Sequence, residues 1–228
     1  MQTSIFTRLS ALSCTDLSDA MDRLKIVCQC TDIMPLDRTF NLTGKAWTLR
    51  YGPIGLDGGS VGDYIDDLEA GQVVVIDNQA RLDTTVWGDL LTSTAARKHL
   101  AGTVIDGICR DVDRALELNY PIFSRGNWMR TGKDRVRVEA VQEPVTLGGV
   151  RVQPDDWLRG DGDGLVVIPA ASLSEVLAVA EEIHQAEEHI RAAIEAAITA
   201  TTPCRRRVAD ICLFRQNLIQ KIVYFTVA

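Results

Sequence analysis

The sequence predicts a mixed fold in which short strands alternate with helices, either α/β or α+β. Three β-branched runs read as buried strands, at residues 73–76, 103–106 and 165–168. Helical patterns follow the first two of these runs, at 89–99 and 111–118. A third observation is the long helical pattern that begins after Pro169. Strands and helices interleaved in this way place candidate functional residues in the loops at strand ends.

The other elements can be placed in chain order from local signals. An amphipathic helix is expected at 15–24, a strand at 44–51, a glycine-rich loop at 52–62 and a helix at 63–69 that Gly71 ends. Residues 145–152 predict a hairpin that turns at two glycines, and residues 161–164 a turn into the last strand. Ser172 with Glu175 forms a capping box for the long helix. Its length exceeds what one small domain covers, so part of it is expected to pack on another subunit.

Length, charge and cysteine content limit the classes of protein to which this chain can belong. The 228 residues suit one domain over 1–200, followed by a tail at 201–228 whose basic and bulky apolar residues differ from what precedes it. The tail carries a net charge of +4, which leaves −11 for the rest of a chain of net charge −7. An acidic body argues against nucleic-acid binding. No apolar run could span a membrane and no export signal opens the chain. Six cysteines without a CxxC pair fit a reducing cytoplasm.

The most informative feature is the run Trp87-Gly88-Asp89-Leu90-Leu91, followed by Arg110-Asp111 after the 103–106 strand. A helix that begins at Gly88-Asp89 offers free backbone N–H groups to an anion. The Arg110 guanidinium matches a carboxylate, and Asp111 can bind a hard cation. Each residue has a plain alternative: an exposed ion pair for Arg110 and Asp111, and a helix N-terminal acid for Asp89. A strand and a Gly107 bend directly before the pair favour the functional interpretation.

This spaced motif resembles the family that contains 4-hydroxy-4-methyl-2-oxoglutarate aldolase and the regulator of ribonuclease activity A. Weaker matches occur in the family's order over about residues 10–195: Leu17 to Leu24, Ala70 to Asp77, Pro121 to Gly126 and Gly160 to Pro169. The tail at 201–228 does not match. The resemblance implies a three-layer β/β/α swivelling-domain (RraA-like) fold with a long C-terminal helix, assembled as a homotrimer or homohexamer.

The resemblance also implies a site and a reaction. Asp111 would bind Mg²⁺ or Mn²⁺, Arg110 would stabilise an enolate oxygen, and Asp89 would hold a water that moves protons. The substrate-binding residues would be Gly88, Asp89, Leu90, Leu91 and Arg110, with the backbone N–H groups on a pyruvate carboxylate. Glu187 would approach the site of an adjacent subunit, although a solvated helix face is its plainer interpretation.

Two functions of different classes follow. The first is a divalent-metal-dependent aldolase that cleaves a 4-hydroxy-2-oxo acid to pyruvate and decarboxylates oxaloacetate as a side activity, since both reactions need the same electron sink. The second is a non-catalytic regulator that binds a protein partner such as a ribonuclease. The presence of Asp111 favours the aldolase, because a non-catalytic regulator need not keep that carboxylate. Cys109, next to Arg110, is expected to be a packed small residue, because no histidine lies near it in sequence.

Overall fold

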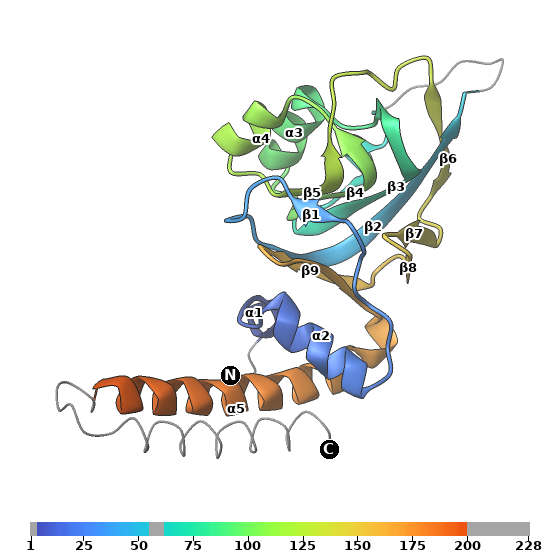
Figure 1. Ribbon diagram of the computed structural model, residues 1–228. Coiled ribbons are helices and arrows are strands. Elements are labelled where there is room, and N and C mark those ends of the chain that lie inside the picture. The colour runs from blue at the N-terminus through green and yellow to red at the C-terminus, as the bar shows by residue number, and fades with distance from the viewer. Residues whose placement is uncertain (1–3, 55–61, 200–228) are drawn as a thin grey trace. The chain divides into compact units, whose positions relative to one another are not determined.

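The computed structural model (Figure 1) describes residues 4–54 and 62–199. The chain divides into two compact units, Met1–His184 and Gln185–Ala228. The predicted tail at 201–228 and most of the predicted loop at 52–62 lie outside the described residues. No helix in the described ranges is both long enough and apolar enough to cross a membrane.

The first unit is built on one sheet. In the described part of the chain its strand order is β1-β5-β4-β3-β2-β9-β10, with β6 paired to β2 outside this path. These strands are β1 (Met34–Pro35), β2 (Leu42–Pro53), β3 (Gln72–Thr85), β4 (Gly102–Cys109), β5 (Ile122–Asn127), β6 (Val136–Val141), β9 (Trp157–Asp161) and β10 (Gly164–Ile168). Strands β2 to β5 are parallel to one another, so their carboxyl ends meet at one edge.

The sheet curls towards closure. Cys30 donates its N–H to the Leu165 carbonyl at 3.0 Å, and Val167 donates to the Cys28 carbonyl at 3.0 Å. The segment that makes these bonds then pairs with β5 through β1, so it connects the two ends of the sheet. Apolar side chains of β3, β4 and β5 thereby share a buried core with those of β9 and β10. The hairpin β7 (Val145–Leu147) and β8 (Val150–Val152) covers the same core.

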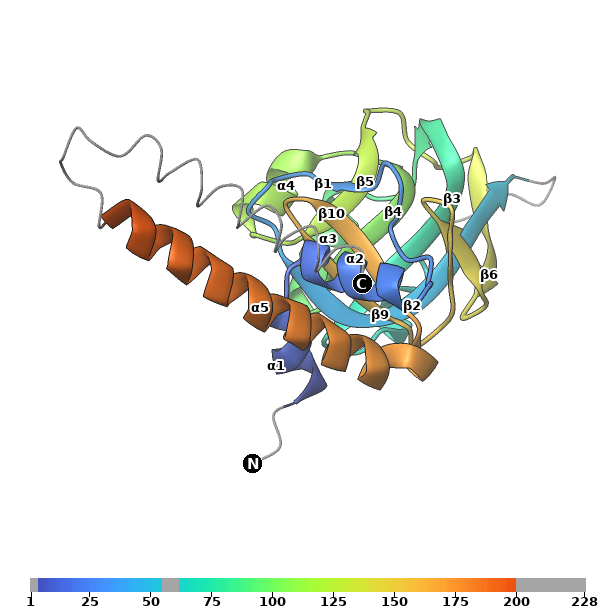
Figure 2. The same cartoon turned by 60° about the horizontal axis from the view of Figure 1, so that its bottom comes forward.

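Helices cover the opposite face of the parallel strands. Helices α3 (Asp89–Arg97) and α4 (Val112–Glu117) lie side by side there (Figures 1 and 2). Trp47, Leu49 and Ile76 are buried beneath this layer. Helices, parallel strands and the returning strands therefore form the three layers expected from the sequence, α, β and β.

A third core attaches the N-terminal helices to the last strand. Helix α1 (Ile5–Ser10), helix α2 (Cys14–Arg23) and the start of α5 (Leu173–Thr199) bury apolar side chains against Val166 and Ile168 of β10. Ser13 and Asp16 form a capping box, so α2 begins one residue before the predicted helix. An ion pair between Arg8 Nε and Glu181 Oε1, at 2.7 Å, joins α1 to α5.

Two predicted elements are wrong, and the strand predicted at 73–76 is only the first part of β3. The helix expected at 63–69 is only a 3₁₀ turn, Ile65–Asp67, because the Gln72 side chain accepts the Glu69 N–H at 2.8 Å and turns the chain into β3. The loop expected from residue 52 starts later, because Gly52 and Pro53 continue β2 and pair with β6. The predicted hairpin at 145–152 and the strand at 165–168 are confirmed. The long helix begins at Leu173 after a 3₁₀ turn, Ala170–Ser172.

Candidate active site

The candidate site lies where β3 and β4 end. Asp77 pairs with Asp106, but the register then shifts twice, so that Arg81 pairs with Gly107 and Thr85 with Ile108. At Gly107 a Cβ atom would lie only 2.9 Å from the Asn78 Cβ, so the close approach of the two strands requires glycine there. The bend expected at Gly107 is thus present, and it directs the Arg110-Asp111 pair towards the start of α3.

The start of α3 has backbone N–H groups that no N-cap side chain accepts. Gly88 is the N-cap and provides no side chain to cap the helix. The Trp87 indole donates from Nε1 to Thr92 Oγ1 at 2.9 Å, and that hydroxyl donates to the Gly88 carbonyl at 2.9 Å. Trp87 is 2% exposed and stacks on Tyr120 with ring centroids 6.4 Å apart. The Trp87 indole, the Thr92 hydroxyl and the Gly88 carbonyl therefore satisfy one another. The N–H groups of Leu90 and Leu91 have no intrahelical acceptor and stay available.

Arg110 and Asp111 meet this helix start directly. Arg110 donates its backbone N–H to the Trp87 carbonyl at 3.0 Å. The Asp111 Oδ2 accepts the backbone N–H of Asp89 at 3.2 Å and lies 3.3 Å from Arg110 Nε. Asp111 adopts a left-handed backbone conformation (φ 55°, ψ 43°), which aspartate tolerates better than most residues. The pairing predicted from sequence spacing is present, with both side chains partly open to solvent.

Gly88 makes this approach possible. A Cβ atom at Gly88 would lie 2.7 Å from Asp111 Oδ2 and 3.3 Å from Arg110 Nε. The first distance is shorter than real Cβ contacts allow. Any other residue at this position would therefore push the carboxylate or the guanidinium away.

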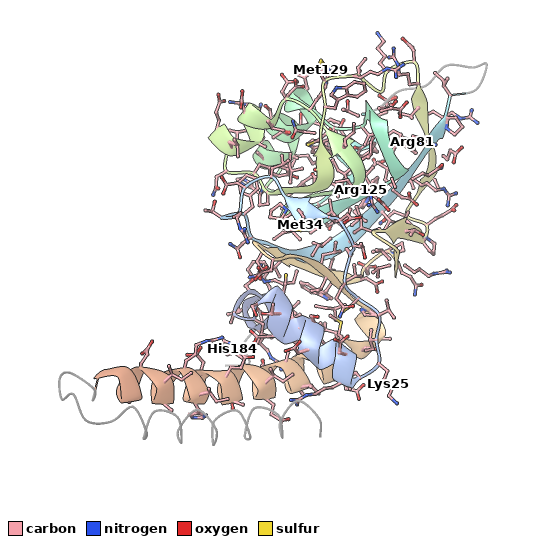
Figure 3. All side chains as sticks on the ribbon, in the orientation of Figure 1. Lys25, Met34, Arg81, Arg125, Met129 and His184 are labelled. Carbon is pink, nitrogen blue, oxygen red and sulfur yellow. The ribbon has the colours of Figure 1, made fainter. Side chains whose placement is uncertain are left out.

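A small cavity of about 250 Å³ opens between these groups. Its wall contains every predicted substrate-binding residue: Gly88, Asp89, Leu90, Leu91 and Arg110. The other wall contains Trp87, Gly62 and four residues that sequence reasoning missed: Thr85, Val86, Thr131 and Gly132. Asp111 lines a second cavity of about 270 Å³ on the other side of Arg110, with Asn127, Trp128 and Met129. Met129 lies at the edge of the sheet far from α1 and α2 (Figure 3).

The loop that carries Thr131 and Gly132 is bound to the end of β3. The Arg130 carbonyl accepts both the backbone N–H of Thr85, at 3.0 Å, and its hydroxyl, at 2.9 Å. At Gly132 a Cβ atom would lie 2.2 Å from the Thr85 carbonyl oxygen, so only glycine permits this packing. The sequence signal that could have found the loop is weak, a single Thr-Gly pair between charged residues.

Glu187 and Cys109 are the two remaining residues that the sequence analysis singled out. Glu187 belongs to the second unit, where its Oε2 accepts from Arg191 Nη2 at 2.8 Å. Its predicted role at an adjacent subunit's site stays a prediction. Cys109 is fully buried, and burial raises the pKa of its thiol to about 11, so the expectation of an unreactive packed residue agrees with its environment.

The protein has a three-layer fold built around parallel strands. At the ends of these strands, a helix start without an N-cap side chain lies beside an arginine–aspartate pair. A family model described as RraA-like, Aldolase/RraA, matches residues 14–167, and the chain belongs to this family. The predicted family and fold are both confirmed.

Individual relatives agree with this assignment. The chain is 31% identical over 191 residues to a protein of Halalkalibacterium halodurans named "Putative 4-hydroxy-4-methyl-2-oxoglutarate aldolase", covering 81% of this chain and 85% of that one. It is 37% identical over 199 residues to Protein DlpA of Legionella pneumophila, covering 86% of this chain but only 32% of that much longer protein. The crystal structure of Streptomyces coelicolor RraAS2, titled an unusual member of the RNase ES inhibitor RraA protein family, superposes with a TM-score of 0.77 at 28% identity, covering 83% of this chain and 98% of that one.

Proposed function

We propose that this protein is a divalent-metal-dependent aldolase that cleaves a 4-hydroxy-2-oxo acid, such as 4-hydroxy-4-methyl-2-oxoglutarate, to pyruvate. Decarboxylation of oxaloacetate is its side activity. The observation that carries the proposal is one small cavity lined by the uncapped start of α3 and by Arg110, with Asp111 beside it. The Halalkalibacterium halodurans relative's name supports the same reaction.

The α3 start would bind the pyruvate end of the substrate. The N–H groups of Leu90 and Leu91 would bind the substrate carboxylate, because they are free of intrahelical partners and lie at the positive end of the helix dipole. The Arg110 guanidinium would lie over the 2-oxo group. Negative charge collects on that oxygen when the C–C bond breaks, and a fixed guanidinium stabilises it.

Proton transfer would use Asp89. The bond to be cleaved lies next to an alcohol, whose proton must leave as the electrons move towards the ketone. Asp89 is exposed at the first position of α3 and lines the cavity, so its carboxylate would hold a water able to accept that proton. The electron pair left on the carbon alpha to the ketone is then protonated to give pyruvate.

Asp111 fits a divalent cation of the Mg²⁺ or Mn²⁺ kind. Among residues 4–54 and 62–199 no three His, Cys, Asp or Glu side chains gather to form a protein-only metal site. Mg²⁺ commonly uses one or two carboxylates and keeps several waters, so one aspartate with the substrate oxygens suffices. Oδ1 of Asp111 accepts no hydrogen bond among the described residues and is available for this role. When bound, the cation would supply Lewis-acid stabilisation of the enolate oxygen.

The test is pyruvate release from 4-hydroxy-4-methyl-2-oxoglutarate and from oxaloacetate, coupled to lactate dehydrogenase, with Mg²⁺, Mn²⁺ or EDTA. Arg110→Ala should lower kcat by about 10²–10³-fold, as removal of one oxyanion donor does elsewhere. Arg38→Ala is the matched control, since Arg38 is exposed and makes only long contacts, with Asp163 at 3.9 Å and with the Gly162 carbonyl at 3.5 Å. Asp111→Ala should abolish Mn²⁺ binding measured by electron paramagnetic resonance. Absence of metal-dependent turnover in the folded wild-type protein would refute the proposal.

The second candidate function is a regulator that binds a protein partner such as a ribonuclease. The name of the Streptomyces coelicolor relative favours it, and so do exposed apolar side chains around the cavities, at Leu82, Leu90, Trp128 and Met129. We propose instead that these side chains pack between copies in a homotrimer or homohexamer, in the cytoplasm. Light scattering distinguishes a trimer or hexamer from a monomer. Inhibition of a ribonuclease without aldolase turnover would favour the regulator.

A further inference from the structure

Arg159, in β9, is a buried cation without an anionic partner. Its residue is only 6% exposed. The guanidinium donates from Nε to the Leu12 carbonyl at 3.0 Å and from Nη2 to Asn41 Oδ1 at 3.1 Å. Nη1 donates to the carbonyls of Leu42, at 3.4 Å, and of Gly160. All four acceptors are neutral, and no carboxylate among the described residues forms an ion pair with it.

The carboxylate nearest to Arg159 along the strand is engaged elsewhere. Asp161 accepts the backbone N–H of Cys14 at 2.8 Å and that of Asp163 at 3.0 Å. Burial of an arginine without a directly paired charge is unfavourable, because the lost hydration is not replaced by an opposite charge. A guanidinium has five N–H groups, and these four hydrogen bonds leave one N–H of Nη2 for a further acceptor.

Arg159 is one of the residues that line a cavity of about 420 Å³. This cavity is distinct from the candidate active site, because Gly71 and Ala101 in its wall precede β3 and β4, whereas the active site follows the same strands. Since β3 and β4 are parallel, the two cavities lie at opposite ends of the sheet. The other residues of the wall are Phe6, Ser10, Asn41, Leu42, Thr43 and His99.

His99 supplies a second donor group to this cavity. It follows α3 in a left-handed conformation, with φ 56°. Its carbonyl accepts the Gly71 N–H at 2.9 Å, which ties the residue to the cavity wall. The imidazole makes no hydrogen bond or ion pair with any described residue. His99 and Ser10 are both exposed on this wall, and the Ser10 hydroxyl makes no hydrogen bond with any described residue.

We propose that this cavity binds a small oxyanion, a phosphate or a carboxylate, between Arg159 and His99. The oxyanion would provide the charge that Arg159 lacks and accept its remaining N–H. The His99 imidazole and the Ser10 hydroxyl would donate to its other oxygens. The exposed Phe6 ring, at 53%, offers apolar contact for a short organic group attached to the oxyanion. This site is independent of the proposed aldolase chemistry.

The test is calorimetric titration with inorganic phosphate, and separately with acetate, in the Arg110→Gln protein. That background removes the guanidinium of the candidate active site and so weakens anion binding there. Any anion still held by the Leu90 and Leu91 N–H groups is recognised because the His99→Asn substitution at the Arg159 cavity leaves its Kd unchanged. His99→Asn keeps a residue that accepts a left-handed backbone, and should raise the Kd by about tenfold. His189→Asn is the matched control, because His189 is exposed on α5 and outside this cavity, and should leave the Kd unchanged.

Arg159→Lys keeps the charge but loses the fork, and should weaken binding further if the variant folds. Stronger binding of phosphate than of acetate would assign the ligand to phosphate compounds, and the reverse to carboxylates. An anomalous peak for soaked selenate beside Arg159 would support the site directly. No heat with either anion in the Arg110→Gln protein would overturn the proposal. Equal Kd values for the His99→Asn protein and its parent would overturn it as well.

Discussion

Gly88→Ala tests whether the contact between the α3 start and Asp111 is needed. The added Cβ would lie 2.7 Å from Asp111 Oδ2, whereas ordinary contacts begin at 3.4 Å, so the carboxylate must move by about 0.7 Å. That movement stretches the bond from the Asp89 N–H, which is already 3.2 Å long. A hydrogen bond to a charged group contributes about 1.5–3 kcal/mol, and partial exposure of Asp111 places this one at the lower end.

The weakened hydrogen bond should affect both function and stability. About 1.4 kcal/mol corresponds to tenfold, and misplacement of a catalytic group by about 1 Å can cost about 10²-fold. We therefore expect kcat/KM for pyruvate release to fall by about 10–100-fold and the Mn²⁺ Kd to rise. The free energy of unfolding should fall by no more than about 1.5 kcal/mol, the lower end of that bond's contribution, because the extended backbone of Gly88 is one that alanine can adopt.

The assays are steady-state kinetics, Mn²⁺ titration and urea denaturation on the same preparations. Gly62→Ala is the matched control: it adds the same methyl to the same cavity, but its nearest neighbour is a Leu91 methyl at 3.4 Å. We expect the control to keep its activity within about twofold. Wild-type kcat/KM and Mn²⁺ affinity in the Gly88→Ala protein would refute the reasoning, since the geometry of Asp111 would then be irrelevant to both.

Three further outcomes are expected. Trp87→Phe should lower the free energy of unfolding by about 1–2 kcal/mol, because it leaves the Thr92 hydroxyl without its indole donor. Strict additivity with Thr92→Val would contradict that coupling. Because burial raises the pKa of Cys109 to about 11, about one thiol in a thousand is ionised at pH 8. Mass spectrometry should find Cys109 alkylated by iodoacetamide only after denaturation, and rapid labelling of the native protein would contradict burial. The hydrogen bond from Arg8 lowers the pKa of Glu181, so the pair stabilises the fold above the unfolded pKa of about 4.3 and less as pH falls. Both side chains are about one-third exposed, so Arg8→Gln should cost less than about 1 kcal/mol at pH 7 and almost nothing at pH 2; an equal cost at both pH values would argue against the ionic origin.

Elements with strong local signals were predictable from the sequence. The hairpin at 145–152 has Gly148 and Gly149 at its turn, both with positive φ, and helix α3 has its expected bounds within two residues. The arginine–aspartate pair and the helix start were also predictable as neighbours, because parallel strands bring their carboxyl ends to the same edge.

Strand β3 was predicted too short for a physical reason. From Asp77 onwards most of its residues are polar, which ordinarily marks a loop, yet Asp77 and Asn78 are buried. Asp77 Oδ2 accepts the Thr146 N–H at 3.2 Å, and Asn78 donates to the Thr84 carbonyl at 3.0 Å. These partners come from the folded structure, so no window of sequence could show that the polar groups would be satisfied.

The cavity wall at Thr131 and Gly132 was missed for a related reason. Its position depends on the Arg130 carbonyl and on the two donors of Thr85, which lie 45 residues apart along the chain. Nothing in the local pattern around Thr131 marks that contact.

The uncapped start of α3 has a consequence for how this family can change its substrates. Its donors belong to the main chain, so replacing Leu90 or Leu91 by any residue except proline alters the surroundings of the donors and leaves the N–H groups in place. Selection acting on side chains can therefore reshape the pocket for new molecules while the main-chain donors proposed to bind a carboxylate stay in place.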